Sequence, residues 1–416
     1  MKLLLSLYAC EPNRGSEPGV GWAWALGMSR RHETIVLTRA NNRSAIEDAL
    51  DRLAIPPDRR PTFLYVDLPD WVCGLKKRGI LPTRIYYFLW QLAARRAFDR
   101  SGLRVDIIHH VTFCSYVVPG FWRHRHEKVV LGPLGGFSVC PHRFLRAYPV
   151  RSRMAECLRG LSREAWRFAP IFRAAAASAD RVFFTDRKIA ARASEIGIRN
   201  DVLLDVAVPE PLLSSRFNEF PTKANQLTWA GTLAGHKACE IALRAYQRAF
   251  APSKVPADSS DPFPPPLFKI FGDGPDRDRL RSLASELGID RFVQFEGVRP
   301  QDELWAEIGK SKAFVFTSIR DTCGSVSLEA LACQTPLVCF NHQGVGTVAD
   351  ETCAIAIEPK DWDDAIARFA EAMKTLAQDA GKVSRMGKAG RKRALEMFSW
   401  ERKFDFVDSV YGEVLS

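Results

Sequence analysis

Two carboxylates, Asp321 and Glu329, stand eight residues apart on either side of a Gly324-Ser325 pair. A Gly-Ser pair before an apolar segment is typical of a helix start, where backbone N–H groups and the positive end of the helix dipole bind anions. Glu329 would lie about one turn into this helix, where a buried carboxylate needs hydrogen-bond partners. The vicinal hydroxyl groups of a sugar would provide them, so the segment indicates a site for an anion beside a polyol.

A lysine has a comparable position earlier in the chain. The segment GTLAGHK at 231–237 follows an apolar run and opens a helix, so Lys237 would lie beside helix N-terminal amides. This arrangement suits a phosphate group. Two further turns, FGDGP at 271–275 and VQFEG at 293–297, also follow apolar runs. Each of these loops taken singly fits an ordinary turn or cap, and their order along the chain carries the weight.

The first half of the chain offers weaker candidates. Gly19 and Gly21 precede or open a helix and could bring backbone N–H groups to an anion, although neither the GxGxxG fingerprint nor a Walker A sequence is present. His109 and His110 end an apolar run, and since successive strand residues face opposite ways, one of them could point toward a ligand. The alternatives are a tight turn for the glycines and a structural role for the histidines.

Short apolar runs alternate with amphipathic segments in two series, and this pattern would position all of these residues. Near-continuous apolar strands between helices indicate parallel sheets covered on both faces. We therefore expect an α/β fold with two doubly wound, Rossmann-like domains facing across a cleft, with ligands held by the loops after the strands. The expected strands are 2–9, 34–38, 63–66, 106–109, 128–131 and 181–185, then 227–230, 267–271, 292–295, 313–317, 336–340 and 353–357.

The domain boundaries follow from the same pattern. We expect an N-terminal domain at 1–208, a proline-containing linker at 209–225 and a C-terminal domain at 226–400. The proline-rich stretch 251–266 interrupts the second series, so it is interpreted as a surface insertion. The amphipathic segment 401–416 follows a completed second sheet, so we expect a terminal helix that crosses back to the N-terminal domain.

Composition excludes several classes of protein. The 416 residues are 46% hydrophobic and 26% charged, as in globular proteins, and no apolar run has the length of a membrane span. The ten cysteines form no CxxC pair and no Cys/His metal spacing. We expect buried, reduced thiols in a cytoplasmic protein and no metal site.

The positive charge is concentrated in one stretch. Residues 75–200 carry 24 Lys/Arg and 8 Asp/Glu, whereas the whole chain has a net charge of +11. The basic, aromatic segments 75–98 and 141–174 suit the surface of an anionic membrane. The alternative is that the aromatic side chains are core and the arginines a solvated face. The chain contains no helix-turn-helix, RNP or zinc-finger pattern, so no nucleic acid is expected as a partner.

The ordered motifs resemble glycosyltransferase family 4, a group of retaining glycosyltransferases with the GT-B fold. The family pattern GRLxxxKG is retained at Gly231, Leu233 and Lys237, while GxGP at 272–275 and VxFxG at 293–297 are complete. The E-x7-E pattern is carried by Asp321, Gly324, Glu329 and Ala330. The segments GSEPGVGW at 15–22, HHVTF at 109–113 and GPLGG at 132–136 are similar to one branch of the family, so the resemblance covers nearly the whole chain.

The resemblance implies a role for each motif. Glu329 would bind the ribose of a nucleotide-sugar donor, Asp321 the donor sugar, and Lys237 the diphosphate. His110, or with less support His109, would face the sugar from the N-terminal domain, and the base would lie near Val298. No metal or other cofactor would be needed. The other implied donor-binding positions are Gly324, Ser325, Val326, Gly231, Thr232, Gly19 and Gly21.

The resemblance implies transfer of a hexose-type sugar, with retention, to a saccharide or a polyprenyl-diphosphate-linked acceptor in cell-surface polysaccharide or glycolipid synthesis. The enzyme would be cytoplasmic and peripheral on the inner face of the plasma membrane, with the acceptor on the N-terminal domain. Thr232 replaces the usual arginine and Asp321 the usual glutamate. The alternatives are therefore a non-catalytic or altered protein that binds a nucleotide sugar, and a nucleotide-sugar epimerase or hydrolase.

Overall fold

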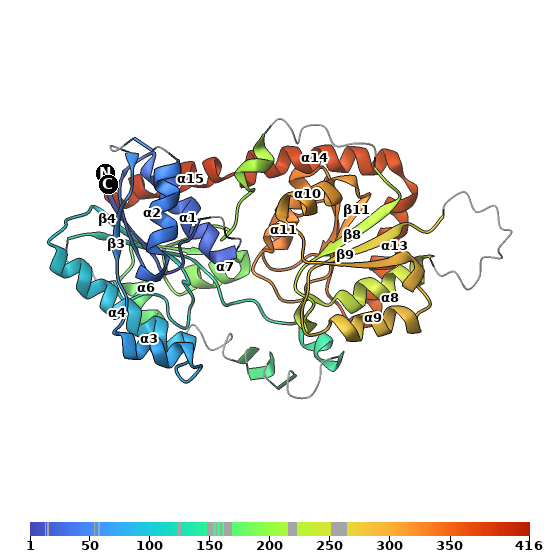
Figure 1. The fold of residues 1–416 in the computed structure, drawn as a ribbon, viewed down its shortest axis with the longest axis horizontal. Helices are drawn as coiled ribbons and strands as arrows, with labels where there is room; N and C mark the ends of the chain where they lie inside the picture. Colours follow the sequence, from blue (N-terminus) through green and yellow to red (C-terminus); the bar gives the residue numbers. More distant parts are fainter. Residues whose placement is uncertain are drawn as a thin grey trace. The chain divides into compact units, whose positions relative to one another are not determined.

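The chain folds into two compact α/β units, seen in a computed structural model (Figure 1). The first unit contains Met1–Phe137, Glu164–Asp205 and Trp400–Ser416, and the second contains Ser138–Arg163 and Val206–Ser399. Both are built on parallel sheets, which confirms the predicted fold class. The structure describes residues 1–12, 14, 16–53, 55–56, 59–122, 126–147, 153–154, 156–158, 160–161, 169–214, 223–250 and 264–416.

The first unit has a seven-stranded sheet in the order β3-β2-β1-β4-β5-β6-β7. The strand order reverses between β1 and β4, the place where doubly wound sheets bind ligands. Its strands are β1 (Lys2–Leu7), β2 (Glu33–Thr38), β3 (Thr62–Tyr65), β4 (Ile107–Thr112), β5 (Lys128–Leu134), β6 (Arg181–Phe184) and β7 (Asn200–Val202). Its helices are α1 (Ser16–Ser29), α2 (Arg43–Arg52), α3 (Asp70–Lys77), α4 (Thr83–Ser101), α6 (Pro170–Ala177), α7 (Arg187–Glu195) and α15 (Trp400–Leu415).

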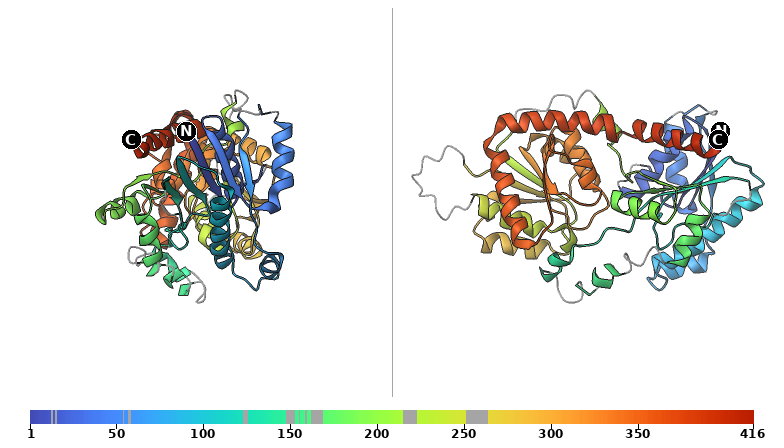
Figure 2. Two further views of the ribbon diagram at one scale, coloured as in Figure 1. Left: turned by 90° about the vertical axis from the view of Figure 1, so that its left-hand side faces the viewer. Right: turned by 180° about the vertical axis from the view of Figure 1, so that it is seen from behind.

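Helices cover both faces of this sheet because its strands are apolar on both sides (Figures 1 and 2). Leu3 and Leu5 of β1 belong to a core shared with α1, α2 and α15. Leu4, which points the other way, belongs to a core shared with α4, α6 and α7.

The terminal helix α15 packs on α1 within the first unit. The Phe404 ring lies 5.5 Å from that of Trp24, and Arg31 donates to Asp408 at 2.8 Å. The Tyr411 hydroxyl lies 2.5 Å from Nδ1 of His109 on β4. The segment predicted to leave the second sheet therefore completes the core of the first.

The second unit has a six-stranded sheet in the order β10-β9-β8-β11-β12-β13, again with a reversal, here between β8 and β11. Helices α8, α9 and α13 share a core with alternate residues of β8, such as Leu227 and Trp229. Helix α11 packs against α14 and against β11 and β12. The strands are β8 (Gln226–Ala230), β9 (Leu267–Phe271), β10 (Val293–Gly297), β11 (Ala313–Phe316), β12 (Leu337–Phe340) and β13 (Ala354–Ile357). The helices are α8 (Cys239–Phe250), α9 (Arg277–Glu286), α10 (Gln301–Lys310), α11 (Ser325–Ala332), α12 (Val345–Val348), α13 (Trp362–Gln378) and α14 (Ala380–Phe398).

The units do not follow the boundaries expected from the order of the chain. Residues 138–163 were expected in the N-terminal domain at 1–208 but group with the second unit, because the buried Phe144 ring packs 5.5 Å from that of Phe340. Val208 also belongs to the second unit, since its N–H donates to the Phe398 carbonyl at 2.9 Å. Of the predicted linker and insertion, residues 215–222 and 251–263 lie outside the described residues.

Candidate functional site

Three glycine-containing loops interlock at the carboxyl ends of β8, β9 and β10. The Gly231 N–H donates to the Phe271 carbonyl at 3.0 Å, and the Gly272 N–H donates to the Gly297 carbonyl at 2.7 Å. A Cβ atom at Gly272 would overlap the Gly231 carbonyl, and one at Gly274 would overlap the backbone of Leu233. The glycines thus allow three loops to stack backbone against backbone. Thr232 stays exposed at this edge of the sheet.

Lys237 and Asp321 form an ion pair in the second unit. Their side chains are only 20% and 19% exposed, so water screens the pair less than a surface pair. Lys237 precedes α8, and its carbonyl accepts from the Thr317 hydroxyl at 3.0 Å. Two residues that the sequence places 84 positions apart therefore meet where β8 and β11 end.

Neighbouring residues hold Asp321 in place. Its N–H donates to Oε1 of Gln343 at 2.7 Å, and its carbonyl accepts from the Ser138 hydroxyl at 2.8 Å. Gln343 in turn donates to the Val139 carbonyl at 2.9 Å. The segment at 138–139 thus braces the acidic loop. Sequence reasoning missed Gln343 and Ser138, because no motif links them to Asp321.

Helix α11 begins beside this pair. Gly324 is its N-cap and has φ of +72°, and a Cβ atom there would overlap the Phe316 ring and lie 3.2 Å from Asp321. The cap makes no side-chain hydrogen bond to the helix. The N–H groups of Ser325 and Val326 are therefore left by the helix itself for another acceptor.

Glu329 lies one turn into α11 with a buried side chain. The Trp305 indole N–H donates to its Oε2 at 2.8 Å. Burial raises the pKa of this carboxyl, while hydrogen bonds from Trp305, Ser325 and Gln301 oppose that shift. A carboxylate can accept about four hydrogen bonds, so these three donors leave it capacity to accept from a hydroxyl group. The sequence places Trp305 in an amphipathic helix but contains no motif that predicts its hydrogen bond to Glu329.

Val298 follows β10 and is 76% exposed, so its side chain is accessible to a flat ligand such as a base. Together the second unit presents a lysine, two carboxylates and a helix N-terminus from loops at the same edge of one sheet. Such a set can bind a diphosphate and orient hydroxyl groups.

Gly19 and Gly21 have a packing role in the structure that the prediction did not foresee. Both lie inside α1, where a Cβ atom would overlap the carbonyl of Arg14 or of Ala9, respectively. The N–H of Gly21 lies beyond the first turn, where helical hydrogen bonding uses it. Close packing of α1 on the preceding loop therefore accounts for these glycines without an anion; Gly15 lies outside the described residues.

The structure does not place His110 toward a sugar. The strand β4 continues through it, its ring is fully buried, and its nitrogens lie 2.9 Å from the Ser6 hydroxyl and 2.7 Å from the Tyr87 hydroxyl. Burial lowers the pKa of His110 to about 3, so the ring is neutral at physiological pH. In this arrangement it links β1, β4 and α4.

His109 is equally buried and points to the opposite face. Its Nε2 lies 2.8 Å from the Gly132 carbonyl, which can only accept, so this nitrogen carries the proton. Nδ1 then accepts from the Tyr411 hydroxyl. Burial lowers the pKa of His109 to about 3 as well. Its role here is to join α15 to the sheet.

Sequence reasoning missed a polar cluster at the carboxyl ends of β1 and β2. Arg39 donates to the Tyr8 carbonyl at 3.0 Å, and its guanidinium lies 4.5 Å from the centre of the Tyr8 ring. Lys76 donates to the Tyr8 hydroxyl at 3.0 Å. The sequence did contain a signal for this cluster, because Tyr8 directly follows β1 and Arg39 directly follows β2.

Glu17 was also missed, although it lies in the glycine segment. Its carboxylate accepts from the Phe113 N–H at 3.0 Å, just after β4. Burial raises the pKa of Glu17 to about 7, the Phe113 hydrogen bond opposes the shift, and Asp205 adds to it. Glu17 therefore titrates near neutral pH at the ligand edge of the first sheet.

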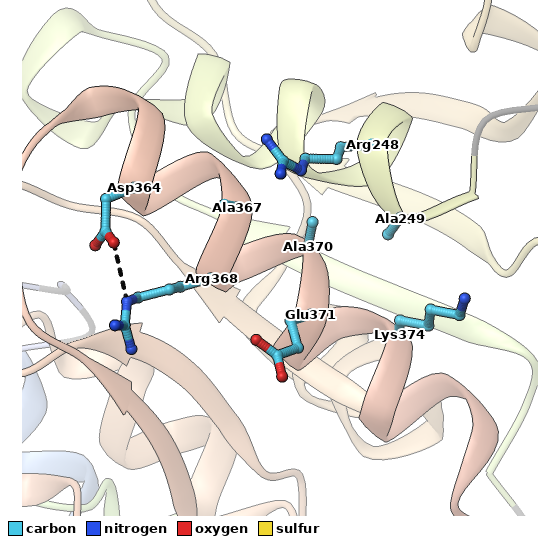
Figure 3. A pocket seen from close by; sticks show the side chains of 8 residues that line it. All are labelled: Arg248, Ala249, Asp364, Ala367, Arg368, Ala370, Glu371 and Lys374. Carbon is cyan, nitrogen blue, oxygen red and sulfur yellow. Dashed lines mark hydrogen bonds and ion pairs between the residues drawn. The ribbon is translucent and has the colours of Figure 1, made fainter.

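An open groove of about 540 Å³ lies between α8 and α13 (Figure 3). Asp364 accepts from Arg368 at 3.2 Å within it. None of the predicted site residues lines it, so it has no part in the site. The lining residues are Arg248, Ala249, Asp364, Ala367, Arg368, Ala370, Glu371 and Lys374.

Two further observations bear on the predictions. Across the described part of the chain, no three His, Cys, Asp or Glu side chains are grouped so that they could hold a metal ion. Among the described helices, none is both long and apolar enough to cross a membrane.

Comparison with known proteins places this site in a family context. Residues 213–393 match the family model of glycosyl transferases group 1. The D-inositol 3-phosphate glycosyltransferase of Salinispora tropica is 29% identical over 207 residues, which are 49% of this chain and 42% of that protein. The matched region thus spans less than half the length of this relative.

Solved structures extend the similarity to the whole chain. Sucrose-phosphate synthase from Thermosynechococcus elongatus has a TM-score of 0.63 at 17% identity, covering 99% of this chain and 98% of that one. Anabaena HepE in complex with UDP has a TM-score of 0.59 at 12% identity, covering 99% of both chains. Residues 213–393 are therefore similar to glycosyl transferases group 1, and the whole chain has the GT-B fold.

Proposed function

We propose that the protein is a retaining glycosyltransferase that moves a hexose-type sugar from a nucleotide-diphosphate sugar to a saccharide or lipid-linked acceptor. The observation that carries the proposal is the pairing of Lys237 with Asp321 beside the N-terminus of α11. A cation, a helix N-terminus and a carboxylate at one sheet edge match the needs of a diphosphate joined to a sugar. The match of residues 213–393 to the family model of glycosyl transferases group 1 supports the same reaction class.

In the proposed donor complex, each group has a separate task. Glu329 accepts from the ribose hydroxyls, and the base lies along exposed Val298. Lys237 and the N–H groups of Ser325 and Val326 hold the diphosphate. Asp321 exchanges its bond with Lys237 for bonds from hydroxyls of the sugar. The structure of Anabaena HepE with UDP is consistent with a uridine nucleotide as the first donor to test.

The chemistry follows from where charge develops. The bond between the anomeric carbon and the diphosphate oxygen breaks, and its electron pair stays on the leaving diphosphate. An acceptor hydroxyl attacks the same face of the sugar, and its proton passes to the departing phosphate oxygen. Lys237 and the α11 N-terminus stabilise the growing negative charge, which is the role of preorganised electrostatics in such steps. No metal is part of this proposal.

The anomeric configuration of the product tests the mechanism. Proton NMR of the product formed from an α-linked donor should show an α-linkage at the earliest time points. A β-linked product would contradict the same-face mechanism, while leaving donor binding intact.

A second candidate is a non-catalytic protein that binds a nucleotide sugar. Thr232 stands where the family carries an arginine, and Asp321 already neutralises Lys237 in this structure. Release of free nucleotide from the donor, with or without an acceptor, would exclude this candidate. Interconversion of two nucleotide sugars without an acceptor would instead indicate an epimerase.

On the acceptor side, we propose a saccharide carried on a polyprenyl diphosphate for surface polysaccharide or glycolipid synthesis, with the protein peripheral on the inner face of the plasma membrane. The basic excess in residues 75–200 supports an anionic surface. The aromatic residues of segments 75–98 and 141–174 give less support to a membrane contact. Several of them are core residues: Tyr86, Tyr87, Trp90, Phe144 and Phe172. Tyr148, Trp166 and Phe168 lie outside the described residues.

A further inference from the structure

Helices α3 and α4 follow one another as a hairpin (Figure 1). The hairpin carries exposed apolar side chains that the core does not use. Trp71 is 70% exposed, Ile80 is 64% exposed and Ile85 is 50% exposed. All three lie within 15 residues of one another, at the start of α3, in the connecting loop and in the first turn of α4. Single exposed apolar residues are common, but three in one short hairpin call for an explanation.

The inward face of α3 is already occupied. Val72 is buried, the Cys73 thiol lies 3.4 Å from the Tyr86 hydroxyl, and Lys76 reaches the Tyr8 hydroxyl. The outward face is open, because a Cβ atom added at Gly74 or Gly79 would meet nothing within 4 Å. Trp71 is on this open side, three residues before Gly74 and one helical turn away.

The same hairpin presents cations. Lys77, Arg78 and Arg84 are exposed, and none of the three makes an ion pair with any residue that the structure describes. Asp70, next to Trp71, is the one acidic residue between 70 and 85. Exposed cations thus alternate with exposed apolar side chains between residues 77 and 85.

We propose that the α3–α4 hairpin, residues 70–85, is the surface that docks on an anionic lipid bilayer. Trp71, Ile80 and Ile85 enter the headgroup region, and Lys77, Arg78 and Arg84 pair with lipid phosphates. The inference deepens the proposed function and rests on its lipid-linked acceptor, since it names the part of the first unit that brings the protein to the lipid.

The chemistry favours a bilayer over a protein partner. Interface cores between proteins are depleted in lysine and form contiguous apolar patches. Here Ile80 and Ile85 lie within two residues of Arg78 and Arg84, which suits the boundary of a membrane, where apolar parts enter and charged ends stay with phosphate and water. Tryptophan is enriched at that same boundary.

Flotation of the full-length protein with vesicles tests the surface. Wild-type protein should float with phosphatidylcholine vesicles that contain phosphatidylglycerol, and much less with phosphatidylcholine alone. The triple variant Lys77→Gln, Arg78→Gln, Arg84→Gln should lower the partition coefficient at low salt by about 100-fold. The triple variant Trp71→Ser, Ile80→Ser, Ile85→Ser should lose binding that persists at high salt, since salt screens only the charged contribution.

A matched control comes from the second unit. Met397 on α14 is 60% exposed and lies outside the hairpin and outside both basic segments, so Met397→Ser should bind vesicles as wild type does. The proposal is overturned if wild-type protein does not float, or if only the control variant loses binding. It is also overturned if the hairpin variants keep vesicle binding and instead change the oligomeric state, which would make this face a contact between copies of the chain.

Vesicle binding tests the docking surface separately from the proposed donor binding. Stabilisation by UDP and release of UDP from a donor need no membrane, and the hairpin variants should retain both. Loss of vesicle binding with donor binding intact supports the docking surface. A protein that floats through the hairpin but binds no nucleotide would leave the docking surface standing and reject the donor assignment.

Discussion

At the scale of single residues, the ion pair between Lys237 and Asp321 fixes the side chains of the candidate site. Lys237 and Asp321 each satisfy the other at a partly buried position, and Gln343 and Ser138 fix the loop that carries Asp321. In the proposed donor complex the donor replaces this contact, so Lys237 would meet the diphosphate already positioned. Removing one preorganised donor of this kind costs enzymes a large part of their rate.

We therefore predict that Lys237→Ala lowers the turnover number of donor cleavage by about 10²- to 10³-fold. Steady-state release of nucleotide from the preferred donor measures it. Lys310→Ala, which removes a half-exposed lysine paired with Glu307, is the control and should turn over as wild type does. Equal rates for Lys237→Ala and wild type would remove Lys237 from the mechanism.

Glu17 predicts a dependence of stability on pH. Its pKa rises from 4.5 to about 7 on folding because of burial, so between these values the folded state holds a proton that the unfolded state has lost. Stability contributed by this group is therefore full at low pH and declines as the pH rises through this window. Glu17→Gln, which still accepts from the Phe113 N–H, should stabilise the protein at about pH 8 by on the order of 2 kcal/mol and much less at about pH 5.

Thermal unfolding of both proteins across this pH range measures the difference. Asp205, Tyr87 and Cys114 interact electrostatically with Glu17, and none of these three carries a positive charge. Glu286→Gln, on the exposed surface of α9, should leave the melting temperature unchanged throughout. A constant difference between Glu17→Gln and wild type at all pH values would contradict the assignment.

At the scale of elements, the packing of α15 on α1 has a sharp steric requirement. A Cβ atom at Gly27 of α1 would overlap the buried Phe404 ring of α15. That ring also packs against Trp24 and Trp400 at 5.5 Å, so it has no room to withdraw. Glycine lowers the helix propensity of α1 at position 27, but it allows α1 to approach Phe404 of α15 closely.

We predict that Gly27→Ala lowers the free energy of unfolding by about 1–3 kcal/mol, as overpacked cores do. Gly412→Ala in α15 is the matched control, because a Cβ atom there meets nothing within 4 Å. That change should stabilise the helix by about 0.5–1 kcal/mol. Chemical denaturation compares the two, and a Gly27→Ala protein as stable as wild type would show that α15 can shift on α1.

Elements were largely predictable from the sequence, and the ends of some strands, such as β9, were predicted as well, but the end of β4 was not. All twelve expected strands are present, because each is a short apolar run between helices. The short strand β7 was missed, since its Asn200-Asp201-Val202 sequence has no apolar run. Strand β4 was predicted to end at His109 but continues through His110 to Thr112. The polar side chain of His110 did not end the strand, because it has hydrogen-bond partners in the core.

The candidate site was predictable where motifs follow strands in order. Lys237, Asp321, Gly324 and Glu329 come together because parallel strands end at one edge of a sheet. No sequence pattern predicts the contacts that remote segments supply, such as that of Gln343 with Asp321 and that of Trp305 with Glu329.

At the scale of the whole molecule, the chain crosses between the two units more than once. Residues 138–163 leave the first unit to complete the second, and α15 returns to complete the first. The return of α15 could be expected from an amphipathic helix left over after a finished sheet. The exchange at 138–163 could not, because the segment is assigned by tertiary contacts, such as those with Phe340, Asp321 and Gln343, that no sequence pattern predicts.

The central claim is that the second unit binds a nucleotide-diphosphate sugar through Glu329 and its neighbours. The most direct measurement is thermal stability against UDP-, GDP-, ADP- and dTDP-sugars, for wild type, Glu329→Ala and the closer mimic Glu329→Gln. One nucleotide class should stabilise wild type by about 2.7 kcal/mol at a concentration of about 100 times Kd. Both variants should lose that shift, whatever their own melting temperatures. No shift with any nucleotide sugar, or an undiminished shift in both variants, would contradict the account.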